Sequence, residues 1–503
     1  MSSSSASHQP LARRAFLGGG LAAGAGAWLT GNALPADAAT TASPFVVSVR
    51  DLGAVGDGVA DDTAYFTAAI ALAAGNAGAV FVGSGTYRVG PLAISQTCTM
   101  LGCGVGSVIR LVPGSAADLL TVTAPNVTVR QLLLDANGSS GSTVVVGPGG
   151  DNTTLQACDL LGSGGPALRV RAADAVVDRV LVRGAGGVGI SVEGADRASV
   201  LHNQIAGTGG DSIAVAGGAG SLVRGNILDG TGGATRAAGI RISSGAVDAR
   251  VSANTVRATT SHGILVDGLG GSGTGRVGVR GNTVVGPGGH GLYVAGASGV
   301  TATANSISGA GGSGIAADQG AAGLVAATNV AQGCHGSGLR LDGTSRFSLI
   351  GNVLWGNGTA PPTADDAHGV LLGAAAPVSN GVVAANRCGD GGGATQLSGI
   401  ALRGSVSSVS LRANTLDGNS AAGTSAAGGA AVDGTGSLPV SVLSNVTVGA
   451  AGTAVPHGLP QSPGTVLISM RSAGQVWIAA PSDATNVHLA ADAAGRTCDV
   501  MVG

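Results

Sequence analysis

Residues 281–294 read Gly281-Asn282-Thr283-Val284-Val285-Gly286-Pro287-Gly288-Gly289-His290-Gly291-Leu292-Tyr293-Val294. The segment joins an Asn, an apolar residue two positions later, a Gly-rich turn and a short stretch in which apolar and other residues alternate. The pattern returns along most of the chain, and its copies begin at Asn203, Asn226, Asn254, Asn282, Asn305, Asn329, Asn352, Asn386, Asn414 and Asn445. Their spacings are 23, 28, 28, 23, 24, 23, 34, 28 and 31 residues. A period near 23 residues with occasional insertions predicts a solenoid.

Each repeat predicts three short strands. Alternation with period two, as in Leu292-Tyr293-Val294, is typical of a half-buried strand and not of a helix. A second strand precedes each repeated Asn, and a third contains the apolar residue that follows it. We therefore expect an all-β fold that winds as a three-faced coil, with coils about 4.8 Å apart. The Asn is expected at a corner, where it tolerates left-handed dihedrals and can form a ladder from coil to coil.

Composition agrees with this fold and excludes some functions. The 503 residues include 92 glycines but only 2% aromatic residues, which suits many tight corners around a narrow interior. A net charge of −2 without a basic cluster argues against nucleic acid as a partner. The six cysteines lack metal-ligand spacing, so we interpret them as small buried residues, with a disulfide as an alternative after export. Whether the protein uses a cofactor, and which, does not follow from the sequence.

Residues 1–38 predict an export signal. The pair Arg13-Arg14 precedes Phe16 and an apolar, Gly/Ala-rich run, and Ala36-Asp37-Ala38 offers a small-x-small cleavage site. The segment resembles a twin-arginine signal, although Ala12 stands where Ser or Thr is usual. The resemblance implies export of a folded protein to the periplasm, cell surface or exterior, without stable membrane insertion after cleavage. A membrane anchor is the alternative, but the run is short and rich in Gly.

Residues 45–91 predict an N-terminal cap. Val49-Arg50-Asp51-Leu52-Gly53-Ala54-Val55-Gly56-Asp57-Gly58-Val59-Ala60-Asp61-Asp62-Thr63 precedes an Ala-rich helix that we expect to end near Ala74. The stretch and the following Gly85-Thr86-Tyr87 resemble the entry segment of the pectate-lyase-3 superfamily. This resemblance implies a single-stranded, right-handed parallel β-helix over residues 92–447. Asp61 or Asp62 is expected to cap the helix, Gly75 to end it, and the helix to cover the first strand edge.

Residues 448–503 break the repeat. Alternating segments at 465–469, 476–478, 487–489 and 498–500 predict a small β-sandwich-like module. It resembles C-terminal modules of phage-tail and secreted β-helix proteins, which implies that a homotrimer is one assembly to consider. We expect His457 to have a turn or packing role, not to be a ligand. For Trp477 we favour core packing over stacking on a sugar.

The candidate site lies where the repeats align chemistry-bearing residues in rows on one face. Residues around the Gly-(Ile/Leu)-x-Val strand should stand about 7 Å apart along a strand and about 4.8 Å apart between coils. In a chain only 10% charged, the middle coils gather eight such residues. They are Arg241, His262, Asp267, His290, Tyr293, Asp318, Arg340 and Asp342. Asp211 falls one position out of this alignment.

The cluster suits two reactions on an acidic or extended polysaccharide. A lyase or epimerase acting on a uronan needs a cation, from Arg241 or Arg340, and a base, from Tyr293, His290 or an Arg. A glycoside hydrolase needs two carboxylates, which Asp267 could form with Asp318 or Asp342. The candidate catalytic residues are Arg241, Asp267, His290, Tyr293, Asp318 and Arg340, with His262 and Asp342 as candidates for substrate binding.

Two alternatives remain open. His262, His290 and Asp267 could hold a metal, although no metal ligand is assigned. The signatures of known β-helix hydrolases and lyases are not intact here. The rival hypothesis is therefore a non-catalytic secreted or surface β-helix that binds glycan or a cofactor, with the eight residues on a solvated face.

Overall fold

The computed structural model describes residues 45–503 except 77, 233–236, 270–272, 364, 391–392, 427–440, 459–461, 464–465, 471 and 503. The predicted export signal, residues 1–38, lies outside the described residues, so export stays a prediction. Among the helices described, none has the length and apolar character needed to span a bilayer.

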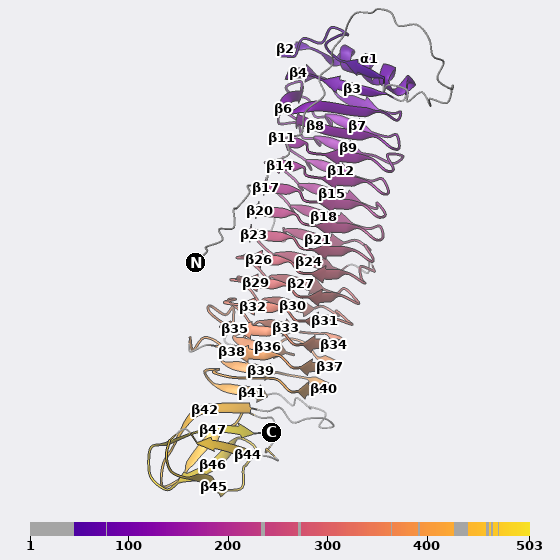
Figure 1. The fold of residues 1–503 in the computed structure, drawn as a ribbon. Coiled ribbons are helices and arrows are strands. Elements are labelled where there is room, and N and C mark those ends of the chain that lie inside the picture. Colours follow the sequence, from indigo (N-terminus) through magenta and orange to yellow (C-terminus); the bar gives the residue numbers. More distant parts are fainter. Residues whose placement is uncertain are drawn as a thin grey trace, which may run out of the picture. The chain divides into compact units, whose positions relative to one another are not determined.

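The described chain forms a parallel β-solenoid whose coils stack one on the next (Figure 1). One face is a 14-stranded parallel sheet. Its strands are β5 (Leu92–Ile94), β7 (Leu120–Val122), β9 (Val144–Val146), β12 (Leu168–Val170), β15 (Ile190–Glu193), β18 (Ile213–Ala216), β21 (Ile240–Ser243), β24 (Ile264–Asp267), β27 (Leu292–Ala295), β30 (Ile315–Asp318), β33 (Leu339–Leu341), β36 (His368–Leu372), β39 (Ser398–Leu402) and β41 (Ala422–Ala426).

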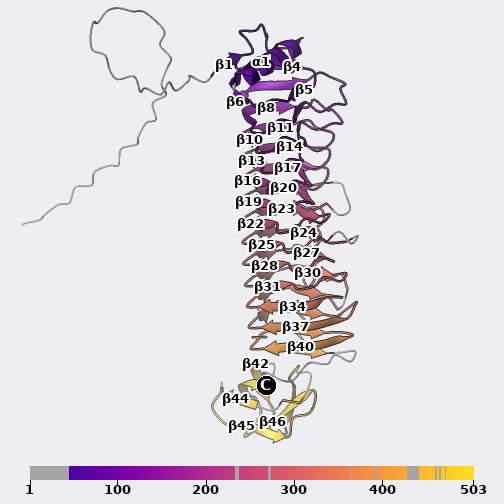
Figure 2. The ribbon, with the colours of Figure 1, turned by 90° about the vertical axis from the view of Figure 1, so that its right-hand side faces the viewer.

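The other two strands of each coil join into one 27-stranded sheet (Figure 2). It contains β1 (Val46–Ser48), β2 (Asp57–Asp61), β3 (Ala79–Val82), β4 (Gly85–Val89), β6 (Thr99–Leu111), β8 (Thr128–Asp135), β10 (Thr154–Gln156), β11 (Asp159–Leu161), β13 (Val176–Asp178), β14 (Leu181–Arg183), β16 (Ser199–Leu201), β17 (Gln204–Thr208), β19 (Leu222–Arg224), β20 (Ile227–Thr231), β22 (Arg250–Ser252), β23 (Thr255–Thr259), β25 (Gly278–Arg280), β26 (Thr283–Val285), β28 (Thr301–Thr303), β29 (Ser306–Ser308), β31 (Val325–Ala327), β32 (Val330–Gln332), β34 (Ser345–Ile350), β35 (Val353–Trp355), β37 (Val378–Ala384), β38 (Arg387–Gly389) and β40 (Val406–Arg412).

Two long strands, β6 and β8, join these rows into one sheet, because β6 pairs with both β3 and β4 and β8 with both β10 and β11. In the later coils the corner between the two strands is very short. One residue with φ between 50° and 68° bends the chain, and it stands immediately before each ladder Asn. These residues are His202, Gly225, Ala253, Gly281, Ala304, Thr328, Gly351, Ala385 and Ala413. Our expectation that the Asn itself adopts the left-handed conformation is therefore wrong, since the preceding residue makes the turn.

The predicted Asn ladder is confirmed. The Oδ1 of Asn305 accepts hydrogen bonds from the backbone N (3.0 Å) and Nδ2 (2.9 Å) of Asn282. Its Nδ2 donates to the Val279 carbonyl at 2.9 Å and to Oδ1 of Asn329 at 2.9 Å. The pattern runs from Asn203 to Asn414 and satisfies buried backbone groups in every coil it crosses. Asn445, assigned to a tenth repeat, instead lies in an antiparallel strand after the solenoid.

Apolar residues from all three strands fill the interior as one continuous core from Val47 to Leu416. Inward positions stack in register, so Ile264 pairs with Leu292 and Leu292 with Ile315 on successive coils. The cysteines behave as small buried residues in five of six cases, Cys103 being exposed, and none forms a disulfide.

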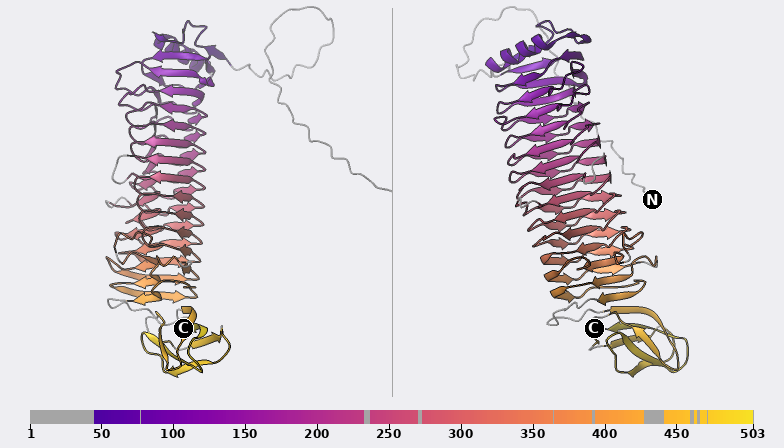
Figure 3. Two further views of the ribbon diagram at one scale, coloured as in Figure 1. Left: turned by 90° about the vertical axis from the view of Figure 1, so that its left-hand side faces the viewer. Right: turned by 180° about the vertical axis from the view of Figure 1, so that it is seen from behind.

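The N-terminal cap matches its prediction in outline. Helix α1 (Thr63–Gly75) ends at the expected Gly75 and lies at the first coils, where it appears as the indigo helix in Figure 3. The Asp61 carboxylate accepts a hydrogen bond from the backbone N of Thr63 at 3.0 Å. Asp62 sits at the capping position but makes no side-chain cap. Its carboxylate instead binds the backbone N–H groups of Val55 and Gly56.

The C-terminal residues form two three-stranded antiparallel sheets, as expected for a small β module. Their strands are β42 (Ser441–Val448), β47 (Arg496–Val502) and β44 (Val466–Met470), and β43 (Thr453–Pro456), β46 (Asn486–Ala491) and β45 (Val476–Ala480). The packing role of His457 is confirmed, because its ring is buried and its Nε2 lies 3.0 Å from the Asp483 carbonyl. Core packing of Trp477 is wrong, since that residue is 46% exposed.

Candidate functional site

The 14-stranded sheet brings the eight candidate residues onto successive coils. Arg241 (β21), Tyr293 (β27) and Arg340 (β33) share one row through the registered pairs along the sheet. Asp267 and Asp318 lie at the ends of β24 and β30. The remaining three residues flank strands. His262 lies two residues before β24, His290 lies two residues before β27, and Asp342 directly follows β33. The predicted rows therefore exist as neighbouring backbone positions.

Three aromatic rings form the centre of this face. The imidazoles of His262 and His290 stack with centroids 5.4 Å apart and an interplanar angle of 4°. The Tyr293 ring lies 4.7 Å from His262 and 5.1 Å from His290. Leu265 and Ala316 pack with Tyr293 in a small apolar cluster, and Tyr293 is only 7% exposed. The expectation of a fully solvated face is therefore not met.

Backbone hydrogen bonds fix the tautomers of the two imidazoles. The Nδ1 of His262 accepts from the backbone N of His290 at 3.1 Å, and the Nδ1 of His290 accepts from Ser313 N at 2.9 Å. Burial, reinforced by the positive charge of Arg340, lowers the pKa of His290 to about 4, so this ring is neutral at pH 7. The proton of a neutral ring then sits on Nε2. His290 can donate a hydrogen bond there, but it has no lone pair left to act as a base.

The phenol of Tyr293 is paired with a carboxylate. Its hydroxyl donates to Asp318, with Oδ1 at 2.8 Å and Oδ2 at 3.0 Å. The amide Nε2 of Gln319 donates to the same phenol oxygen at 3.1 Å. The phenol proton is thus directed at Asp318, and a second donor stabilises negative charge on the phenol oxygen. This arrangement can move a proton between Tyr293 and Asp318.

Both arginines of the site are already paired with carboxylates. Arg340 donates from Nε to Asp342 at 2.8 Å and from a terminal nitrogen to Asp366 at 3.0 Å. Arg241 lies with its Nε 3.2 Å from Oδ2 of Asp211. A sugar carboxylate near Arg241 or Arg340 would therefore meet a guanidinium group whose charge is already balanced by a carboxylate of the protein. The Nε2–H of His290, on a ring that is neutral at pH 7, is a further hydrogen-bond donor on this face.

Asp211 and Asp267 form a second carboxylate pair at this face. Burial raises the pKa of Asp211; the Ala238 N–H and Arg241 oppose this shift, and the negative charge of Asp267 adds to it. Asp267 is half-buried, and one of its oxygens accepts from the backbone N of Leu269 at 3.1 Å. Two carboxylates with unequal environments can divide the roles of acid and base.

Sequence reasoning missed three residues that complete the site: Asp211, Gln319 and Asp366. Asp211 is in register with His262 after all, because Ser212 takes the place of the usual Gly. Asp366 comes from an inserted loop, and its only sequence signal was the acidic pair two residues before β36. Asp342, predicted to bind substrate, has one oxygen bound by Arg340 and the other by the backbone N of Ala375. Among the residues described, no three His, Cys, Asp or Glu side chains could together hold a metal ion.

Short regions of the chain are similar to curated enzymes. Mannuronan C5-epimerase AlgE5 of Azotobacter vinelandii is 38% identical over 118 residues, which is 20% of this chain and 12% of that protein. Mannuronan C5-epimerase AlgE4 of the same organism is 37% identical over 128 residues, 21% of this chain and 23% of that protein. The chain thus spans less than a quarter of the length of these relatives.

Similarity of fold extends further along the chain. The solved structure of pre-mature gene product 12 of bacteriophage phi29 covers 77% of this chain and 55% of its own, with a TM-score of 0.54 and 17% identity. Sequence similarity to a family described as "Right handed beta helix region" covers residues 142–286 and 267–438. This match spans more than half of the sequence and confirms the predicted handedness. The chain belongs to the right-handed β-helix family.

Proposed function

We propose that this protein acts on an acidic polysaccharide, and that the reaction is proton abstraction at C5 of a uronate sugar at the outer face of the 14-stranded sheet. The main supporting observation is the Tyr293 hydroxyl, which is bonded to Asp318 and flanked by two stacked imidazoles. The local similarity to mannuronan C5-epimerases supports the same class of substrate.

The chemistry follows from the proton positions. As the phenol oxygen of Tyr293 takes the C5 proton, its own proton passes to Asp318, so the C5–H bond and the original phenol O–H bond break while new O–H bonds form on Tyr293 and Asp318. The electron pair left on the sugar spreads into the uronate carboxylate. The Nε2–H group of His290 can donate to that carboxylate and stabilise the added charge. Delivery of a proton from solvent to the opposite ring face gives epimerisation, whereas breaking the C4–O bond, with a solvent proton added to the oxygen of the departing sugar, gives elimination.

Hydrolysis is the second candidate, because the Asp211–Asp267 pair has the unequal environments that an acid and a base need. In this alternative Asp211, whose pKa is raised by burial, protonates the glycosidic oxygen. Asp267 then activates water or attacks the sugar directly. The reaction would release new reducing ends and leave the C5 hydrogen in place.

One experiment separates these candidates. The purified protein is incubated in D₂O with polymannuronate, polyguluronate or polygalacturonate, and the products are examined for deuterium at C5, unsaturated ends and reducing ends. We expect deuterium at C5 or unsaturated ends. Tyr293→Phe should lower kcat/KM by a factor of about 10² to 10⁴, because general acid–base catalysis is lost.

Tyr65→Phe, on α1 and many strands away from β27 along the solenoid, is the matched control and should keep wild-type turnover. Reducing ends that disappear in Asp267→Asn but persist in Tyr293→Phe would establish hydrolysis instead. Binding of these glycans without any of the three products would favour the non-catalytic alternative.

A further inference from the structure

A groove of about 530 Å³ lies on the 27-stranded sheet, on a different face from the Tyr293 cluster. It crosses β19, β22, β25 and β28, and three exposed arginines line it: Arg224, Arg250 and Arg280. Gly278 forms part of the floor and leaves it without a side chain at that point. None of these residues belongs to the Tyr293 cluster.

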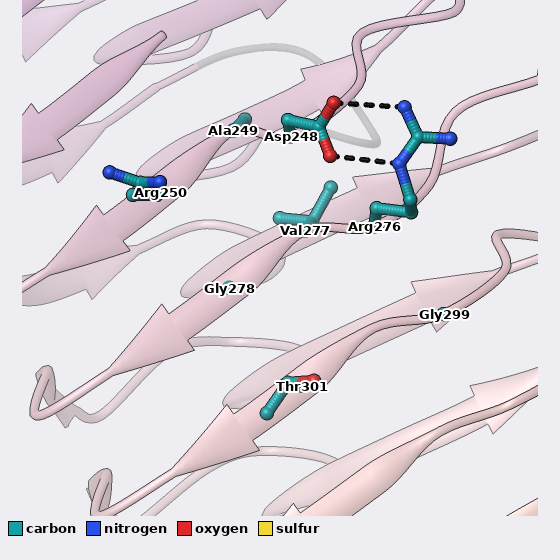
Figure 4. A pocket seen from close by; sticks show the side chains of 8 residues that line it. All are labelled: Asp248, Ala249, Arg250, Arg276, Val277, Gly278, Gly299 and Thr301. Atoms are coloured by element: carbon teal, nitrogen blue, oxygen red, sulfur yellow. Dashed lines mark hydrogen bonds and ion pairs between the residues drawn. The ribbon is translucent and has the colours of Figure 1, made fainter. Parts of the chain in front are cut away.

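The positive charge of this groove is not neutralised by ion pairs. Its lining contains no Asp or Glu, and none of the described residues forms an ion pair with Arg224, Arg250 or Arg280. Arg280 makes one neutral contact, from Nε to the hydroxyl of Thr303 at 3.2 Å. In the adjoining pocket Asp248 is occupied by Arg276 through two hydrogen bonds of 2.8 Å (Figure 4). That carboxylate is therefore hydrogen-bonded to Arg276, and it reaches Arg250 only through its charge.

The spacing of the arginines follows from the register of the strands. Arg224, Ser252 and Arg280 occupy one row, so the two arginines are two coils, about 10 Å, apart. Arg250 occupies the neighbouring row, on the coil between them, opposite Gly278. The positive charges thus alternate between the two rows from one coil to the next along the solenoid axis. A linked sugar chain with one carboxylate on each ring presents acidic groups at intervals of similar scale.

We propose that this arginine groove is a binding subsite for a carboxylate-bearing polysaccharide and anchors the chain away from the face where the chemistry occurs. This assignment rests on the proposed function only for the class of ligand, an acidic polysaccharide. Guanidinium groups match carboxylates in geometry and can bind them through two hydrogen bonds. The hydroxyls of Ser252, Thr301 and Thr303 line the same groove and suit sugar hydroxyls. No aromatic side chain lines it, which disfavours the base stacking used for single-stranded nucleic acid.

Gly278 offers a test that leaves the arginines untouched. Its φ is not left-handed, and a Cβ at this position would meet no atom within 4 Å. Gly278→Tyr should therefore fill the groove without strain. The other test is Arg224→Gln combined with Arg250→Gln and Arg280→Gln. Controls are Ser306→Tyr, which adds the same ring to an exposed position of β29, and Arg183→Gln on β14.

Binding is measured to fluorescent polymannuronate and polygalacturonate, to neutral dextran and to a single-stranded oligodeoxynucleotide, at low and high salt. We expect both groove variants to weaken polyuronate binding at least about tenfold, and the triple variant also to lose most of its salt dependence. The controls should bind like the wild type, and dextran should bind weakly throughout.

Unchanged polyuronate binding in both variants, or no polyuronate binding by the wild type, would overturn the inference. Oligonucleotide binding that is tighter than polyuronate binding and lost in the same variants would overturn the choice of ligand. Tyr293→Phe keeps the two proposals distinct, because it should stop conversion while leaving groove binding intact. If the wild type binds through the arginines yet converts no glycan, the proposed reaction fails and the binding subsite stands.

Discussion

His368 is a buried titratable residue whose ring has no polar partner. It is 1% exposed, and neither ring nitrogen has a hydrogen-bond partner within the described part of the chain. Burial, together with the charge of Arg403, lowers the pKa of His368 to about 4. Its unfolded value is about 6.5, so the unfolded chain binds more protons between these two pH values. Because the buried ring stays neutral while the unfolded chain binds a proton, the free energy of unfolding falls progressively between pH 6.5 and pH 4, by about 3 kcal/mol in all.

His368→Leu should remove this contribution. At pH 7 the variant is expected to be at least as stable as the wild type, because an unpartnered polar ring is replaced by an apolar side chain. Denaturant unfolding at pH 7 and pH 4.5 measures the difference. The loss of stability on acidification should be smaller in His368→Leu than in the wild type, with exposed His335→Gln as the control. An equal loss in all three proteins would show that His368 does not titrate in this range.

At the same scale, the rows of the site could be predicted from the sequence because parallel register places equivalent repeat positions side by side. The side chains that pair with the residues of these rows could not be predicted. Asp366 comes from an insertion of variable length, and the pairing of Tyr293 with Asp318 instead of Asp267 depends on the side-chain conformations. The neutral state of His290 depends on burial and on the charge of Arg340 two coils away, which no single repeat encodes.

The Asn ladder is the element that joins one coil to the next inside the 27-stranded sheet. Asn305 is 2% exposed, and its truncation would leave the Val279 carbonyl and two donors of Asn282 without partners. Each such buried group costs about 1–3 kcal/mol. Asn305→Ala is therefore expected to lower the free energy of unfolding by roughly 3 kcal/mol or more, measured by chemical denaturation.

Ser306→Ala is the matched control, since it removes a polar group from the exposed neighbour on β29 and should change the free energy of unfolding by under about 0.5 kcal/mol. Equal stabilities of the two variants would show that the ladder contributes little.

The strands of each coil could be predicted from the period-two alternation of apolar residues and from the β-branched residues. The corner residue could not be predicted, because a single left-handed residue makes the turn and its identity varies from His202 to Ala304.

For the whole molecule, a solenoid is stabilised by contacts between adjacent coils, so its ends are exposed strand edges unless something covers them. At the N-terminus that cover is α1. Phe66 anchors it: the side chain is fully buried, and its ring packs edge-on against Tyr87 with centroids 5.4 Å apart. The resemblance that predicted this cap was specific in sequence, and the helix was found within a residue of its expected end. The trimer suggested by the C-terminal module stays a prediction.

Phe66→Ala should detach the cap without unfolding the solenoid. Loss of a buried Phe costs about 3–5 kcal/mol, and only the coils that touch α1 lose contacts. Amide hydrogen exchange should accelerate in β1, β3 and β4 but stay slow in β27 and β30, and the uncovered edge should raise light scattering on mild heating. Leu72→Ala, on the same helix but 44% exposed, should change neither readout. Uniform acceleration through β30 would mean that the cap holds the entire solenoid in one cooperative unit, and unchanged exchange in β3 would mean that α1 does not protect the first coil.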